Sequence, residues 1–77
     1  MSGAVFLTRV DREKNVQRWY RVEIAPSLFA PVSVICTWGR LGSSYQRGRV
    51  ISVETVEQGE ALAAKIVAKK LKRQYQI

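Results

Sequence analysis

One short stretch combines residue types that could bind a ligand, and it reads Trp38-Gly39-Arg40-Leu41-Gly42. A tryptophan ring can stack on a base or a sugar, which contributes about 1–3 kcal/mol per stacked base. An arginine beside it presents a planar fork of N–H donors that fits the oxygens of a phosphate. The two glycines allow a left-handed backbone at both ends of a tight turn. The stretch predicts a contact with nucleic acid, but the same ring could plug the end of a core, and the sequence leaves both roles open.

Further cations follow this stretch in two groups. The first lies just after it, and the second falls on the side of a C-terminal helix that is opposite its apolar residues. Every charged residue from Lys65 onward is positive, whereas a face that only maintains solubility usually mixes signs. The nucleic-acid-binding residues predicted from the sequence are Trp38, Gly39, Arg40, Arg47, Arg49, Lys65, Lys69, Lys72 and Arg73.

The charge of the whole chain favours the same kind of partner. Thirteen Lys and Arg residues against six Asp and Glu residues give the 77-residue chain a net charge of +7. Such a field attracts polyanions, of which nucleic acid is the commonest, although a charge that only maintains solubility is the alternative. We expect DNA rather than RNA. A second hypothesis is a protein–protein interaction domain that docks on an acidic partner through the same turn.

The sequence has few residues suited to catalysis or metal binding. The sequence has no histidine and one cysteine, Cys36, so it lacks the usual general base, zinc ligands and an internal disulfide. The expected protein is not an enzyme, has no catalytic residues and needs no cofactor or metal. No apolar run approaches the ~20 residues that span a bilayer, and the N-terminus does not read as a secretory signal. We therefore expect a cytoplasmic monomer without a membrane partner.

Alternating apolar and polar residues predict the strands that must position the Trp38 stretch. We expect them at residues 4–10, 18–25, 32–38 and 46–53. Tyr20 falls on the apolar face of the second strand, and Cys36 is most simply a small buried residue of the third. In the fourth, Gly48 indicates a bulge or a close approach of the backbone. Leu28 and Phe29, in the loop after the second strand, are expected to tuck under the sheet, and an exposed partner-binding pair is the alternative.

A helix is expected after the last strand, with Thr55 and Gln58 as its capping box. Its predicted apolar face consists of Ala63, Ala64, Val67, Ala68, Leu71 and Tyr75. Consecutive strands joined by short links form an antiparallel meander, and the helix covers one of its faces. The predicted fold class is α+β, mainly β: a small antiparallel meander sheet of four strands, or of five, packed against one C-terminal helix. We expect a single domain over residues 1–77.

The chain resembles the WGR domain, a module named for its Trp-Gly-Arg. The resemblance covers nearly the whole length and rests on three motifs: residues 38–42 with Gln46 shortly after, Asn15 followed by residues 19–23, and residues 70–75. Two positions depart from the family pattern. The family often has glycine before the Gln and before the final aromatic residue, where this chain has Tyr45 and Gln74. The departures concern a loop and the helix end, not the fold.

The resemblance implies a nucleic-acid-binding accessory module. In DNA-dependent poly(ADP-ribose) polymerases the WGR domain contacts DNA near a break and relays this to the catalytic domain. The family's Trp lies against the DNA end, and its Arg helps to join DNA and neighbouring domains. Carried over, these roles fall on Trp38 and Arg40, with a preference for ends or nicks. The catalytic domain does not fit in 77 residues, so the chain resembles the short bacterial proteins that are little more than a WGR domain.

Overall fold

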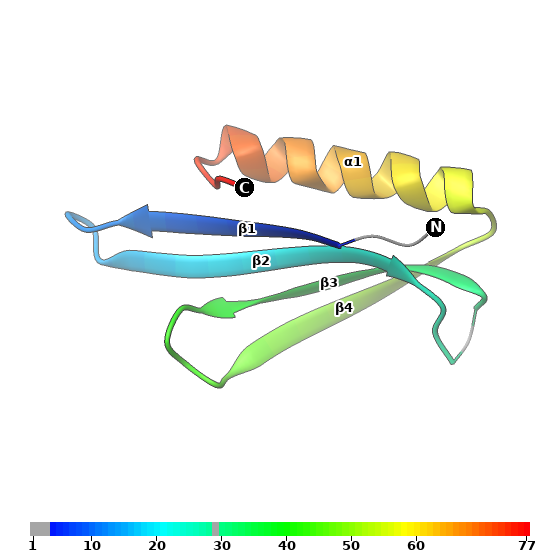
Figure 1. Ribbon diagram of the computed structural model, residues 1–77, viewed down its shortest axis with the longest axis horizontal. Helices are drawn as coiled ribbons and strands as arrows, with labels where there is room; N and C mark the ends of the chain where they lie inside the picture. Colours follow the sequence, from blue (N-terminus) through cyan, green and yellow to red (C-terminus); the bar gives the residue numbers. More distant parts are fainter. Residues whose placement is uncertain (1–3, 29) are drawn as a thin grey trace.

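Short turns divide the chain into four strands and a C-terminal helix, and the computed structural model describes residues 4–28 and 30–77. The elements are β1 (Ala4–Asp11), β2 (Val16–Ala25), β3 (Val32–Arg40), β4 (Gln46–Val53) and α1 (Val56–Lys72). The strands pair in the order β1-β2-β3-β4, each antiparallel to its neighbour, and α1 covers one face of the sheet (Figure 1). The predicted α+β meander is confirmed with four strands. Beyond them, the described residues add a single bridge, between Thr8 and Gln76.

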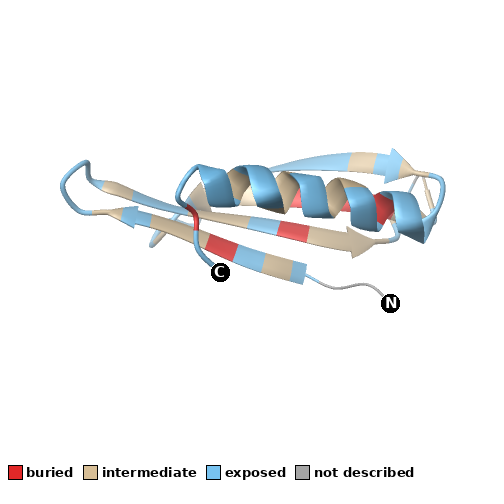
Figure 2. Ribbon diagram, turned by 90° about the horizontal axis from the view of Figure 1, so that it is seen from above, coloured by how far each residue is buried: buried red, intermediate tan, exposed pale blue. Residues whose placement is uncertain are grey.

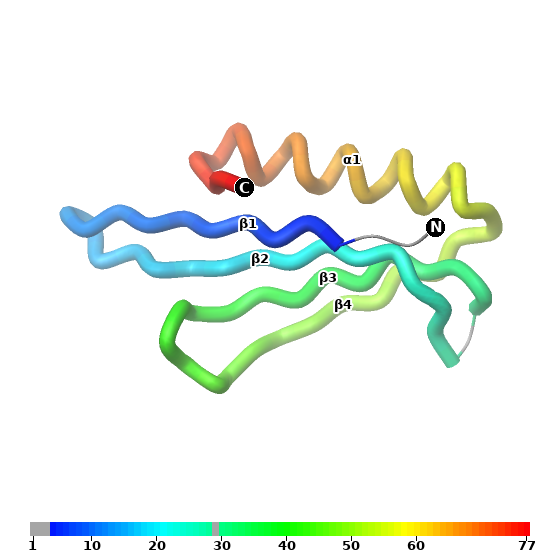
Figure 3. Tube along the Cα trace, in the orientation of Figure 1, coloured from blue at the N-terminus to red at the C-terminus, as the bar shows by residue number. Residues whose placement is uncertain are grey.

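The turn between β1 and β2 is held by its first and last residues. Asp11 Oδ1 accepts hydrogen bonds from the N–H groups of Glu13 at 3.1 Å and Lys14 at 3.3 Å. Asn15 has a left-handed φ of 53°, which asparagine tolerates. Because this turn is tight, both strands extend past their predicted ends, to Asp11 and from Val16. The hairpin projects beyond the C-terminal end of α1 (Figure 3).

The strand β3 is longer than predicted and includes part of the Trp38 stretch. Gly39 and Arg40 are strand residues, opposite Trp19 and Arg18 of β2, and the turn begins only after them. Of the two glycines expected to be left-handed, only Gly42 is, with a φ of 83°. Gly39 is needed for space instead: a Cβ there would lie 2.8 Å from the Tyr45 carbonyl oxygen and 3.0 Å from Trp19 Nε1. The prediction of a turn role for Gly39 is therefore wrong.

The core lies between α1 and the central strands. Val22, Val34 and Cys36 are buried, as predicted for Cys36, and half-buried Tyr20 and Trp38 pack against them. Leu7 of the edge strand β1 is also buried, so the buried positions in Figure 2 are not confined to the central strands. Burial of these side chains supplies the main driving force for folding of so small a domain.

The face that α1 turns toward the sheet differs from the predicted one. Ala64, Ala68 and Leu71 are exposed, whereas the inward side is formed by Gly59, Leu62, Ala63, Ile66, Val67 and Lys70. The helix packs mainly on β2 and β3, where Leu62 and Ile66 bury more apolar area than alanines would. Ala63, Val67 and Tyr75 are covered, as predicted, whereas Ala64, Ala68 and Leu71 border an apolar groove beside β1 and β2 and stay exposed.

Both ends of α1 are fixed by specific contacts. Thr55 Oγ1 accepts a hydrogen bond from the Gln58 N–H at 3.1 Å, and Gln58 Oε1 accepts one from the Glu54 N–H at 2.9 Å. This is the predicted capping box, shifted by one residue on its return bond. At the other end Gln74 has a left-handed φ of 72°, which turns the chain so that Tyr75 is buried beside β2.

Two smaller predictions concern single residues. Leu28 is 96% exposed, so the expectation that it tucks under the sheet is wrong, and Phe29 lies outside the described residues. In the described part of this loop, the Ser27 N–H donates a hydrogen bond to the Ala30 carbonyl at 2.9 Å. At Gly48 the register of β3 and β4 continues without a bulge, and a Cβ there would lie 3.3 Å from Thr37 Cγ2. Of the two alternatives for Gly48, close approach is the one found.

Candidate nucleic-acid interface

Three arginines stand in one cross-strand row near the end of the sheet. Arg9 of β1 is directly opposite Arg18 of β2, which is directly opposite Arg40 of β3. Like charges at directly opposed positions destabilise a sheet, so this row does not serve the fold. Its summed charge attracts anions to this end of the molecule.

A row of large side chains lies beside the arginines. Tyr20 is opposite Trp38, and Trp38 is opposite Arg47. The rings of Tyr20 and Trp38 stack with centroids 5.6 Å apart and an interplanar angle of 10°. Tyr75 meets the Tyr20 ring edge-on, with centroids 6.4 Å apart. Trp38 packs on the core, which is one of the two roles left open by the sequence, and it also borders a cleft.

Lys70 brings a cation from the helix to this aromatic row. Its Nζ lies 4.3 Å from the centroid of the Tyr20 ring and 5.4 Å from that of Tyr75. Such a position over aromatic rings stabilises a cation. Burial, followed by repulsion from Arg73, lowers the pKa of the Lys70 amine from its usual value. Burial, followed by a hydrogen bond with Cys36, raises the pKa of the Tyr20 hydroxyl.

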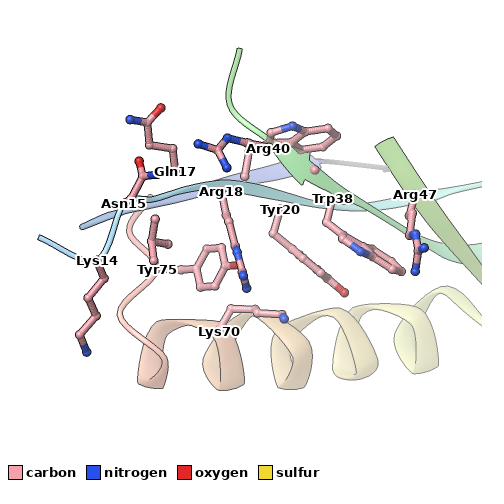
Figure 4. A pocket seen from close by; sticks show the side chains of 13 residues that line it. Lys14, Asn15, Gln17, Arg18, Tyr20, Trp38, Arg40, Arg47, Lys70 and Tyr75 are labelled. Carbon is pink, nitrogen blue, oxygen red and sulfur yellow. The ribbon is translucent and has the colours of Figure 1, made fainter. Parts of the chain in front are cut away.

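All of these side chains except Arg9 line one cleft of about 710 Å³ between the end of the sheet and the C-terminal end of α1 (Figure 4). We call it the cationic cleft. Figure 4 shows the Arg18 side chain extending from β2 toward the helix, between Tyr75 and Tyr20. Among residues 4–28 and 30–77, no carboxylate lines the cleft. Its cations are Lys14, Arg18, Arg40, Arg47 and Lys70, and its aromatic residues are Trp19, Tyr20, Trp38 and Tyr75.

Comparison with known proteins identifies the family. A family model described as the WGR domain matches residues 3–77. The chain belongs to the WGR domain family. A relative of this WGR domain, the uncharacterized protein y4dW of Sinorhizobium fredii (strain NBRC 101917 / NGR234), is 33% identical over 42 residues. That match covers 54% of the chain and 21% of the relative, so the chain matches about a fifth of the relative's length. No solved structure matches the chain significantly.

The WGR family consists of binding modules and is often linked to nucleic-acid binding. In this WGR domain the signature residues lie together at the cleft. Trp38 borders it with a half-buried ring, Gly39 makes room for the Trp19 indole, and Arg40 is exposed. The two departures from the family pattern differ in the backbone conformation that they impose on a residue other than glycine. Tyr45 does not have a positive φ, whereas Gln74 has the left-handed backbone that favours the family's glycine.

The residues predicted to bind nucleic acid fall into two places. Trp38, Gly39, Arg40 and Arg47 line the cationic cleft, and Arg49 lies two residues along β4 from Arg47. The helix residues do not line the cleft, although all of them are exposed: Lys65, Lys69, Lys72 and Arg73.

Sequence reasoning missed several residues of the cleft, namely Lys14, Arg18, Tyr20, Lys70 and Tyr75. Lys70 had a readable signal, because it follows Leu62 and Ile66 at intervals of four residues along the inward side of the helix. Arg18 had none, since the row of arginines depends on strand pairing between distant segments.

The described part of the chain has neither a metal-binding cluster nor a membrane-spanning helix. Among residues 4–28 and 30–77, no group of three or more His, Cys, Asp or Glu side chains could hold a metal ion. In the same part of the chain, no helix has the length and apolar character needed to cross a membrane.

Proposed function

We propose that this WGR domain is a non-catalytic module that binds nucleic acid, preferably DNA, in the cationic cleft. The observation that carries the proposal is the convergence of five cations and a stacked aromatic pair in one cleft that has no carboxylate. A polyanion would relieve the repulsion between the opposed arginines, which otherwise costs stability. The proposal takes the protein to act as a cytoplasmic monomer.

The aromatic row favours nucleic acid over an acidic protein as the ligand. Carboxylates could satisfy the same cations, so an acidic protein partner is the second hypothesis for this cleft. Bases and sugars, however, also present flat surfaces to a ring such as Trp38, and stacking is worth about 1–3 kcal/mol per base. Because the Trp38 ring is half-buried against Tyr20, it presents only an edge or one face and does not insert between two stacked bases. This favours stacking on a terminal nucleotide, as at a DNA end or nick.

The exposed cations outside the cleft suit the flanking backbone. Arg49 and the helix residues Lys65, Lys69, Lys72 and Arg73 would contact phosphates without reading sequence. Each neutralised phosphate adds about 0.9 to the slope of log affinity against log salt concentration. We therefore propose that the affinity falls steeply with salt concentration and depends little on base sequence.

The proposal is tested by fluorescence anisotropy with labelled blunt, nicked and single-stranded DNA at low and moderate salt. We expect submillimolar binding to short duplexes that weakens steeply with salt. Arg18→Gln should weaken binding, and Arg12→Gln is the matched control, because it removes the same charge from the exposed β1–β2 turn outside the cleft. Absence of binding to all three DNA forms at low salt would refute the proposal. Equal losses for the two variants would show that only net charge matters, and would move the site elsewhere.

A further inference from the structure

The two edge strands of the sheet differ in their outward backbone hydrogen bonds. At the β1 edge, Thr8 exchanges backbone hydrogen bonds with Gln76, at N···O distances of 2.8 and 2.7 Å. At the other edge, β4 pairs with β3 alone among the described residues (Figure 1). An unpaired edge strand is a template for another strand, and proteins usually blunt it with charged side chains, proline or a bulge. β4 has no proline, and its register with β3 has no bulge; its charged residues are Arg47 and Arg49, which would repel a basic strand but attract an acidic one.

The backbone groups that β4 presents follow from the ladder. Leu41 N–H donates to the Gln17 carbonyl at 2.9 Å, one residue beyond the strand pair Arg18 and Arg40. This bond sets which pairs of β2 and β3 are hydrogen-bonded, because bonded and non-bonded pairs alternate in an antiparallel ladder. Carried across the sheet, the alternation directs the outward N–H and C=O groups to even-numbered residues on both edges. Thr8, which bonds outward to Gln76, agrees. On β4 the outward-facing residues are Gln46, Gly48, Val50 and Ser52.

The side chains of β4 indicate which strand would fit. Arg47 and Arg49 lie two residues apart on one face of the sheet, and both are exposed. Among the described residues the one ion pair joins Arg21 and Glu23, so neither β4 arginine has a carboxylate partner there. On the other face Val50 is 54% exposed. A strand beside β4 would place carboxylates at alternate positions opposite the arginines, with apolar residues between them.

A second copy of this chain fits this edge poorly. Pairing of two β4 strands would bring arginines close to arginines, and like charges at opposed positions are destabilising. Each chain also carries a net charge of +7. Charge complementarity therefore points to an acidic occupant.

We propose that β4 is a docking edge for an extended acidic peptide segment, which adds to the sheet as a fifth strand and sets alternate carboxylates against Arg47 and Arg49. Main-chain hydrogen bonds at the outward residues would supply affinity, and the arginines would select the spacing of the carboxylates. The edge shares Arg47 with the cationic cleft. Its outward backbone groups and Val50 take no part in the proposed nucleic-acid binding, because Val50 does not line the cleft.

The test uses the full chain and a labelled ten-residue peptide in which Glu alternates with Val. A peptide of the same composition with five Glu followed by five Val controls for charge. We expect the alternating peptide to bind at least tenfold more tightly at moderate salt. Its binding should protect the Gly48, Val50 and Ser52 amides from hydrogen exchange. Equal binding of the two peptides, or shifts confined to the cationic cleft, would overturn the proposal.

Two proline variants distinguish peptide binding at the β4 edge from binding at the β1 edge. Val50→Pro removes an outward N–H of β4, which an edge strand tolerates without loss of its inner ladder. Val10→Pro is the matched control, because Val10 is an outward residue of the β1 edge and is 57% exposed. We expect Val50→Pro to weaken peptide binding at least tenfold and Val10→Pro to leave it unchanged, while both keep wild-type DNA affinity. Wild-type peptide binding by Val50→Pro would contradict the proposal.

A charge variant keeps the proposal testable if a proline variant fails to fold. Arg49→Gln should weaken binding of the alternating peptide severalfold, whereas Arg12→Gln should not. Sedimentation without peptide provides a last control: a dimer that Val50→Pro dissociates would show that a second copy, not an acidic peptide, occupies the edge, and would overturn the proposal.

Discussion

The rings of Tyr20 and Trp38 stack across β2 and β3, with centroids 5.6 Å apart and planes inclined by 10°. This contact joins the core to the cationic cleft, because Tyr20 and Trp38 pack on buried Val22 and Cys36 while also lining the cleft. The stability of the domain and the geometry of the proposed binding site therefore depend on the same pair of rings.

Substitution of Trp38 should consequently affect both properties. We expect Trp38→Ala to lower the free energy of unfolding by about 2–3 kcal/mol, since a large, half-buried aromatic ring is lost. DNA affinity should fall by a further ~1–3 kcal/mol through lost stacking. Trp38→Phe should retain most of both. Urea denaturation and anisotropy titration measure the two effects, and a Trp38→Ala protein that binds DNA normally would remove Trp38 from the site.

Gly39 and Gly59 differ in the space that their surroundings leave for a Cβ atom. In Gly39→Ala the new Cβ would lie 2.8 Å from the backbone oxygen of Tyr45 and 3.0 Å from Trp19 Nε1, so the β3–β4 turn must shift. We expect a loss of about 1–3 kcal/mol in the free energy of unfolding. Gly59→Ala is the control, because its Cβ would meet Val32 at 3.4 Å, an ordinary contact, and alanine favours a helix. Equal stability of the two variants would show that the approach at Gly39 is not restrictive.

The end of α1 contains a correctable strain. Gln74 has a φ of 72°, a conformation that costs an L-residue other than glycine roughly 1–2 kcal/mol. Part of the gain from glycine is offset by the greater freedom of the unfolded chain. Gln74→Gly should therefore raise the free energy of unfolding by about 0.5–1 kcal/mol. Thermal denaturation checks this, with exposed Gln76→Gly as a control that should bring no gain.

Lys70 should show a dependence of stability on pH. Burial lowers its pKa from 10.5, so the unfolded chain binds this proton more tightly than the folded one. Charged Lys70 therefore opposes folding below its lowered pKa, and this cost disappears as the pH rises toward 10.5. The stability of the wild type should rise relative to that of Lys70→Met over this range. A constant difference in urea denaturation across the range would contradict this account.

Much of the fold was predictable because local patterns specify it. The strand alternation around Tyr20 and Cys36 and the cap at Thr55 depend on neighbouring residues, and the structure confirms them. The ends of β3 were not predictable, because Gly39 looks like a turn residue until the Trp19 ring is placed beside it. The inward face of α1 was misjudged because Lys70 is charged, and only its position over Tyr20 makes an inward lysine acceptable.

The candidate site was predictable only where one motif contains it. Residues 38–42 stood out by composition, and their Trp, first Gly and Arg line the cleft. Arg18 and Tyr75 reach the same cleft through strand pairing and the left-handed turn at Gln74, which connect residues distant in sequence. The sequence also did not distinguish the cations at the cleft from those on the outer side of the helix.

An NMR titration of the ¹⁵N-labelled protein with a short blunt DNA duplex tests the central proposal most directly. The account predicts that the largest amide shifts cluster at Arg18, Trp38, Arg40 and Lys70, and that these shifts diminish in Arg18→Gln. Shifts centred on the opposite face of the sheet, around Phe6 and Val50, with none at the cleft, would contradict it.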